Sequence, residues 1–111
     1  MTAIDPAALT GQLIQAVTGA IGQDVTQAEG FAQAQVQALA QQGALVAAGI
    51  AAGQIGEDVQ PFLLDGLKTM ARNLVNTLKG LAAVMVEKAW NALVNTLWAA
   101  IGSAIGKVLP T

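Results

Sequence analysis

The residues of this chain that could do chemistry are few, and the carboxylates are the first to consider. Glu57 and Asp58 are adjacent, and Asp65 follows within the next two helical turns. Paired carboxylates can act as general acid and base, or hold a divalent cation. Acidic residues are also favoured where a helix begins, because the helix dipole leaves partial positive charge there. Since these residues surround a predicted helix start, we favour the structural interpretation.

Nucleophilic catalysis lacks the groups that it needs. The chain contains no Cys and no His, so it offers neither a thiolate nor an imidazole base. Ser103 therefore has no histidine to activate it. A phosphate-binding loop needs Gly, Lys and Ser or Thr in a fixed order, which residues 102–107 do not provide. The sequence predicts a protein that is not an enzyme and that has no metal or cofactor.

Three cations share one side of a predicted helix and form a candidate basic face. Lys68, Arg72 and Lys79 fall within about 40° of one another, taking roughly 100° per residue. Such a row could contact phosphates, but three cations give a weak electrostatic surface and the net charge is -2. We expect the face to be solvated or paired with acidic residues, and nucleic acid is not a predicted partner.

Charge is unevenly distributed along the chain. All basic residues lie in residues 68–107, where Glu87 is the one acidic residue, and every other acidic residue lies in residues 1–67. The acidic part could pack on the basic part within one chain, or head to tail between chains. The sequence leaves both arrangements open.

The composition predicts association. Charged residues make up 11% of the chain and hydrophobic residues 54%, whereas an average soluble domain has roughly 25% charged residues. A small globule needs charge to keep its surface hydrated and apart from its neighbours. We therefore expect much of the surface to be covered by copies of the chain, by another protein or by lipid.

We expect a single all-α domain over residues 1–111, with helices at about 6–21, 25–55 and 62–109. Asp5 followed by Pro6 is typical of a helix start. Asp24 and Gln27 have the spacing of a capping box, which predicts the second start. The connection at 56–61 is short, and a short connection between long helices predicts an antiparallel helical hairpin.

The last of these helices is too long for a compact chain. Residues 62–109 would form a helix on the order of 70 Å long, whereas a compact chain of this length has a radius of gyration of about 13 Å. Either the helix breaks, with Gly80 as the favoured place, and the chain forms a four-helix globule, or the molecule is elongated and forms its core in an oligomer. The low charge favours the elongated oligomer.

Two groups of residues are predicted helix contacts or subunit interfaces. Gly49 and Gly53 are small residues four apart, a spacing that leaves a shallow groove for another helix. The C-terminal region has an apolar arc wider than a two-helix seam needs, and it includes two tryptophans that suit a core or a subunit contact. This second group comprises Leu74, Leu78, Leu81, Met85, Trp90, Leu97, Trp98, Ile101, Gly102 and Ile105.

Two uncharged segments, residues 30–56 and 89–106, are the candidates for membrane insertion. Glutamines interrupt the first, and Asn91, Asn95 and Ser103 interrupt the second. Each therefore fits a helix buried in protein, or lying at an interface, better than a membrane span. No basic residue precedes the first apolar stretch, so a secretory signal is not expected.

Residues 89–102 read AWNALVNTLWAAIG. In composition this segment resembles small helical proteins, rich in Ala, Gly and Gln, that bacteriophages encode, and the resemblance covers about the last fifty residues. Such proteins include virion components that line or plug tails and portals, and membrane-acting lysis proteins of the holin kind. The resemblance identifies no functional residues.

Together with the low charge, the resemblance implies a non-enzymatic structural or assembly protein of a bacteriophage virion. We expect it to self-associate into a symmetric oligomer, or to pack with other virion proteins inside a larger assembly, in the virion or the host cytoplasm. The alternative is a holin-like lysis protein that inserts into the inner membrane, with lipid as its partner.

Overall fold

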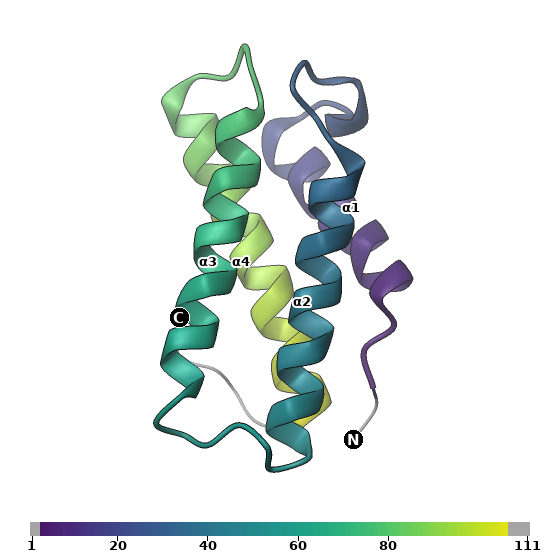
Figure 1. Cartoon of the computed structure of the whole chain (residues 1–111). Helices are drawn as coiled ribbons and strands as arrows, with labels where there is room; N and C mark the ends of the chain where they lie inside the picture. Colours follow the sequence, from purple (N-terminus) through teal and green to yellow (C-terminus); the bar gives the residue numbers. More distant parts are fainter. Residues whose placement is uncertain (1–2, 107–111) are drawn as a thin grey trace.

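The computed structural model describes residues 3–106 and contains four α-helices and one short 3-10 helix (Figure 1). In chain order these are α1 (Pro6–Ile21), η1 (Val25–Gln27), α2 (Gln33–Ala51), α3 (Gln60–Thr77) and α4 (Ala83–Ile105). The described residues contain no strand, which confirms the all-α prediction.

Helix α1 has the bounds that the sequence predicts. The Asp5 carboxylate accepts a hydrogen bond from the backbone N–H of Ala7 at 3.1 Å. Pro6 occupies the first helical position, where a missing N–H leaves no hydrogen bond unmade. Gly22 ends the helix with a left-handed φ of 73°, which glycine adopts without strain. Signals at both ends of the segment are therefore sufficient to define this helix.

The helix predicted over 25–55 starts later and ends earlier than expected. Asp24 accepts hydrogen bonds from the backbone N–H and the hydroxyl of Thr26, at 3.0 and 2.7 Å. These bonds cap only the short 3-10 turn, and the predicted capping box does not form. Gly30 then takes a left-handed φ of 88°. As a result, α2 begins only at Gln33.

The helix predicted over 62–109 is two helices, because the chain reverses direction close to Gly80. Leu78 follows α3 in an extended conformation, and Gly80 has a left-handed φ of 78°. Ala82, which precedes α4, is extended again. A left-handed conformation costs an L-residue about 1–2 kcal/mol but costs glycine little, so the turn forms at this glycine. Residues 107–109 of the predicted helix lie outside the described residues.

The four helices form a bundle, and the prediction of an elongated molecule is wrong. The principal extents are 42 × 24 × 20 Å, and the Cα radius of gyration is 13.7 Å. That radius is close to the value of about 13 Å expected for a compact chain of this length. The elongated alternative fails because α4 folds back along α3 and buries its apolar side within the same chain (Figure 1).

Two loops meet at one end of the bundle, the upper end in Figure 1. One loop, residues 22–32, joins α1 to α2, and the other, residues 78–82, joins α3 to α4. The backbone N–H of Lys79 donates to the carbonyl of Glu29 at 2.9 Å. The backbone of Gly30 lies directly against the carbonyl of Thr77, with no room for a side chain between them. This contact fixes the two halves of the chain to each other.

A cluster of buried apolar side chains runs through the bundle, and all four helices contribute to it. Its most completely buried large residues are Leu9, Leu13, Val25, Val36, Leu39, Leu67, Val75, Leu93, Leu97 and Ile101. Burying one such side chain contributes about 1.5–3 kcal/mol relative to leaving it exposed. The most extensive helix pairing is that of α1 with α4, which joins the first and last helices of the chain.

Alanine substitutions at three glycines should separate the effect of conformation from the effect of the loop contact. Gly30→Ala should lower the free energy of unfolding by about 3 kcal/mol or more, because the left-handed φ is unfavourable and a Cβ would overlap the Thr77 carbonyl oxygen. Gly53→Ala, with a left-handed φ of 72° but open space around it, should lower it by about 1–2 kcal/mol. Gly11→Ala, within α1, should raise it by about 0.5–1 kcal/mol.

Urea unfolding followed by circular dichroism measures all three changes. Equal losses for Gly30→Ala and Gly53→Ala would contradict the close contact between the two loops. A lower free energy of unfolding for Gly11→Ala would contradict the open space around Gly11 in α1.

Candidate functional site

The three residues of the predicted basic face do not form a common surface. The Lys68 ammonium lies over the Trp98 ring, 5.7 Å from its centroid, and the Arg72 guanidinium lies over the Trp90 ring at 4.4 Å. Lys79 lies beyond the end of α3, in the turn that follows. Cation–π contacts of this kind stabilise the packing of α3 on α4. The three cations therefore do not line up as a phosphate-binding surface, because Lys68 and Arg72 contact tryptophans of α4 and Lys79 lies in a loop.

Further polar contacts join α3 to α4 at the same place. Arg72 forms an ion pair with Glu87, with 2.7 Å between Nη1 and Oε1, and Nη2 donates to Oε2 at 3.4 Å. The Trp90 indole N–H donates to the Lys68 carbonyl at 3.3 Å. The hydrogen bond from Arg72 is the main reason why the pKa of Glu87 lies below its ordinary value of 4.5. These contacts position α3 and α4 relative to each other.

The predicted contact residues of the C-terminal region lie inside the bundle. Leu81, Met85 and Trp90 are half-buried. The remaining members of the group are buried: Leu74, Leu78, Leu97, Trp98, Ile101, Gly102 and Ile105. They make helix contacts within one chain because the reversal at Gly80 brings α4 back along α3. The buried members of the group therefore use their apolar surface in folding, and only the three half-buried side chains keep part of theirs exposed.

Gly49 and Gly53 do not form a groove for another helix. The side chain of Ile55 folds back over Gly49, where an added Cβ would collide with it. The Gly49 carbonyl also accepts from the backbone N–H of Ile55 at 3.1 Å and of Gln54 at 2.9 Å. Gly53 is exposed, and its left-handed φ of 72° turns the chain at the end of α2. These two glycines therefore serve to end α2, and their spacing does not mark a helix contact.

The three clustered carboxylates lie on the surface. Glu57, Asp58 and Asp65 are all exposed. Glu57 and Asp58 precede α3, where the helix N-terminus favours negative charge. Within residues 3–106, no three acidic side chains lie close enough together to hold a metal ion.

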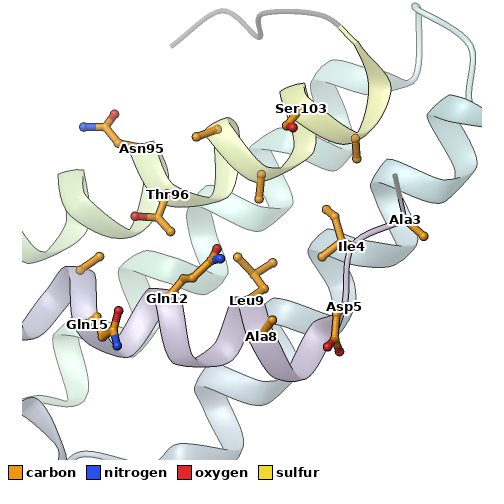
Figure 2. A pocket seen from close by; sticks show the side chains of 14 residues that line it. Ala3, Ile4, Asp5, Ala8, Leu9, Gln12, Gln15, Asn95, Thr96 and Ser103 are labelled. Atoms are coloured by element: carbon orange, nitrogen blue, oxygen red, sulfur yellow. The ribbon is translucent and has the colours of Figure 1, made fainter. Parts of the chain in front are cut away.

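A groove of about 820 Å³ lies between α1 and α4, and sequence reasoning did not predict it (Figure 2). Gln12 and Gln15 line it from α1, and Asn95 and Ser103 line it from α4, among several alanines. Asp5 is the one charged residue of its lining. The groove can therefore donate and accept hydrogen bonds through its amide side chains.

Four large hydrophobic side chains of the described chain are exposed, and none of them was predicted as functional. Leu45 is 66% exposed, Phe62 77%, Val84 59% and Val59 44%. For Leu45 the sequence does contain a signal. At roughly 100° per residue it lies on the side of α2 opposite to Val36, which is buried.

The two uncharged segments that were candidates for membrane insertion contain α2 and most of α4. Both helices bury one side in the common core. Among the helices of residues 3–106, none has both the length and the apolar character that crossing a membrane requires.

The Arg72–Glu87 ion pair predicts a pH-dependent contribution to stability. A folded-state pKa below the unfolded value gives a stabilisation that is complete above the unfolded pKa, and it is lost as pH falls through the folded pKa. Wild type should therefore be more stable than Glu87→Gln near neutral pH, and the two should converge as the pH falls through the lowered pKa of Glu87. Urea unfolding of both proteins across this range measures the difference. Asp65→Asn, which removes an exposed carboxylate outside the ion pair, is the control, and a difference that persists in acid would contradict the assignment.

Comparison of the chain with protein-family models finds no match. Comparison with characterised proteins and with solved structures finds no match either. What the protein does is therefore inferred from its own residues, and those that bear on it are the apolar and charged side chains that the bundle leaves exposed.

Proposed function

We propose that this protein is a non-enzymatic structural or assembly protein of a bacteriophage virion that associates with copies of itself. The observation that carries the proposal is the outward face of α2. This helix contains no charged residue, although one of its sides is open to solvent. An exposed helix face in a small soluble domain normally carries charge, which keeps molecules apart.

The exposed side of α2 has a shape that suits close contact with a second helix. Its outward residues are Ala34, Ala38, Gln41, Leu45 and Ala48. Leu45 projects into solvent, whereas the alanines around it are shallow and let another backbone approach closely. In a two-fold arrangement, Leu45 of each copy would lie against Ala38 or Ala48 of the other. Because the face has no charge, it opposes a copy of itself with no electrostatic repulsion.

The assignment to a virion is supported by the resemblance of residues 89–102 to small helical proteins of bacteriophages. The compact shape supports a role as a repeating unit. A bundle of 42 × 24 × 20 Å that folds within one chain can be added to an assembly without first exchanging helices with its neighbours.

Sedimentation velocity over a wide range of protein concentration tests the proposal. Wild type should associate as concentration rises. Leu45→Glu should raise the dissociation constant by about tenfold or more, because association would bury an unpaired carboxylate. Asn73→Glu adds the same charge to the exposed face of α3 and should leave association unchanged.

A wild-type protein that stays monomeric at every concentration would contradict the proposal. Equal weakening by the two glutamate substitutions would show that added negative charge, and not the α2 face, is responsible. Recovery of the expressed protein from membranes only with detergent would favour the membrane-inserting alternative instead.

A further inference from the structure

The end of the bundle formed by the α2–α3 connection combines exposed apolar side chains with negative charge. Val59 and Phe62 are 44% and 77% exposed. Glu57 and Asp58 precede them in the connection, and both are exposed. Asp65, also exposed, lies one turn beyond Phe62 on α3. We call these five residues the acidic end.

The opposite end of the bundle has the same combination with positive charge. Val84, in the first turn of α4, is 59% exposed, and Leu81 just before the helix is half-buried. Lys79 and Lys88 flank them in sequence, and both are exposed. Val84 and Lys88 are four residues apart and so share one side of α4. We call these four residues the basic end.

Among the residues that the structure describes, no ion pair neutralises either set of charges. Within residues 3–106 the one ion pair joins Arg72 to Glu87, and it involves no residue of either end. The α2–α3 and α3–α4 connections lie at opposite ends of a molecule that is 42 Å long (Figure 1). The 18 residues of α3, about 27 Å at 1.5 Å per residue, separate Glu57 and Asp58 from Lys79, and this is more than twice the screening length of about 10 Å at 0.1 M salt. The acidic and basic ends can therefore meet only between molecules.

We infer that copies of this chain associate end to end, with the acidic end of one copy against the basic end of the next. Phe62 and Val59 then pack on Val84 and Leu81, and the carboxylates surround the lysines. Because the contact joins two different surfaces, a pair of copies still has one unused acidic end and one unused basic end. Further copies can bind there, so the contact repeats into a ring or a filament. The inference rests on the self-association proposed above and adds to the contact across the α2 face a second contact, between the two ends of the bundle.

The loop beside the basic end restricts how the next copy can sit. Asp24 and Glu29 lie in residues 22–32 at the same end of the bundle (Figure 1), and both are exposed. An acidic end placed over that loop would meet like charge, which is unfavourable. The next copy is therefore centred over the α3–α4 turn.

Two charge-reversed variants test the contact. Glu57→Lys with Asp58→Lys produces a chain whose two ends are both positive, and Lys79→Glu with Lys88→Glu produces a chain whose α2–α3 and α3–α4 ends are both negative. Each variant alone should associate about tenfold more weakly than wild type at low salt. An equimolar mixture should recover association, because every positive end then finds a negative one. Sedimentation velocity of each protein and of the mixture gives the result.

The control is Thr69→Lys with Asn73→Lys, which places two cations at exposed positions in the middle of α3 and should leave association unchanged. Circular dichroism verifies that each variant folds, and Glu57→Gln with Asp58→Gln replaces the first variant if the lysines prevent folding. Variants that associate like wild type, or a mixture that stays dissociated, would overturn the end-to-end contact while leaving self-association in place. A wild-type protein that is monomeric throughout would overturn the proposed function itself.

Discussion

The reversal of the chain at residues 78–82 is the constraint on which the rest of the structure depends. Without it, the C-terminal half would be a helix on the order of 70 Å long, with an apolar side that no other part of the chain could cover. Gly80 accepts the left-handed conformation that the turn needs, and α4 then returns to pack on α1, α2 and α3. The hydrogen bond from Lys79 to the Glu29 carbonyl fixes the turn to the loop between the first two helices.

This reversal changes what the low charge of the chain means. The sequence interpretation took the wide apolar arc of the C-terminal region as a surface for other subunits, whereas the bundle uses that arc in its own core. What remains outside the core includes Ala, Gln and Asn, the charged side chains, and a few exposed large hydrophobic side chains, among them Leu45 and Phe62. The reason to expect association accordingly moves from the last helix to the outward face of α2 and to the two ends.

Local signals predicted those features whose cause lies within a few residues. Asp5, Pro6 and Gly22 define α1 at both ends, and Gly80 was the favoured place for a break. The start of α2 was not predictable in the same way. Its position depends on Gly30, which must be left-handed and without a side chain because the Thr77 carbonyl lies against it. That carbonyl belongs to a distant part of the chain, so only the tertiary structure reveals the requirement.

The candidate site shows the same limit. The spacing of Lys68 and Arg72 correctly places them on one side of a helix, but their role depends on Trp98 and Trp90, which α4 supplies. The groove between α1 and α4 likewise forms only because the first and last helices pack together. The periodicity of apolar residues does not predict which helices will pair. The division into acidic and basic parts is visible in the sequence, and the fold places Glu57 and Asp58 at the end of the bundle opposite to Lys79.

The measurement that most directly tests this account is the distance between α3 and α4 in solution. The chain contains no Cys, so spin labels can be attached at Gly66→Cys in the first half of α3 and at Ser103→Cys near the end of α4, both of which are exposed positions. Double electron–electron resonance, with labelled protein diluted into unlabelled protein, should give a distance well below the 42 Å length of the bundle. A distance near 55 Å, the separation of about 1.5 Å per residue along an unbroken helix, would contradict the fold-back and with it the two oppositely charged ends.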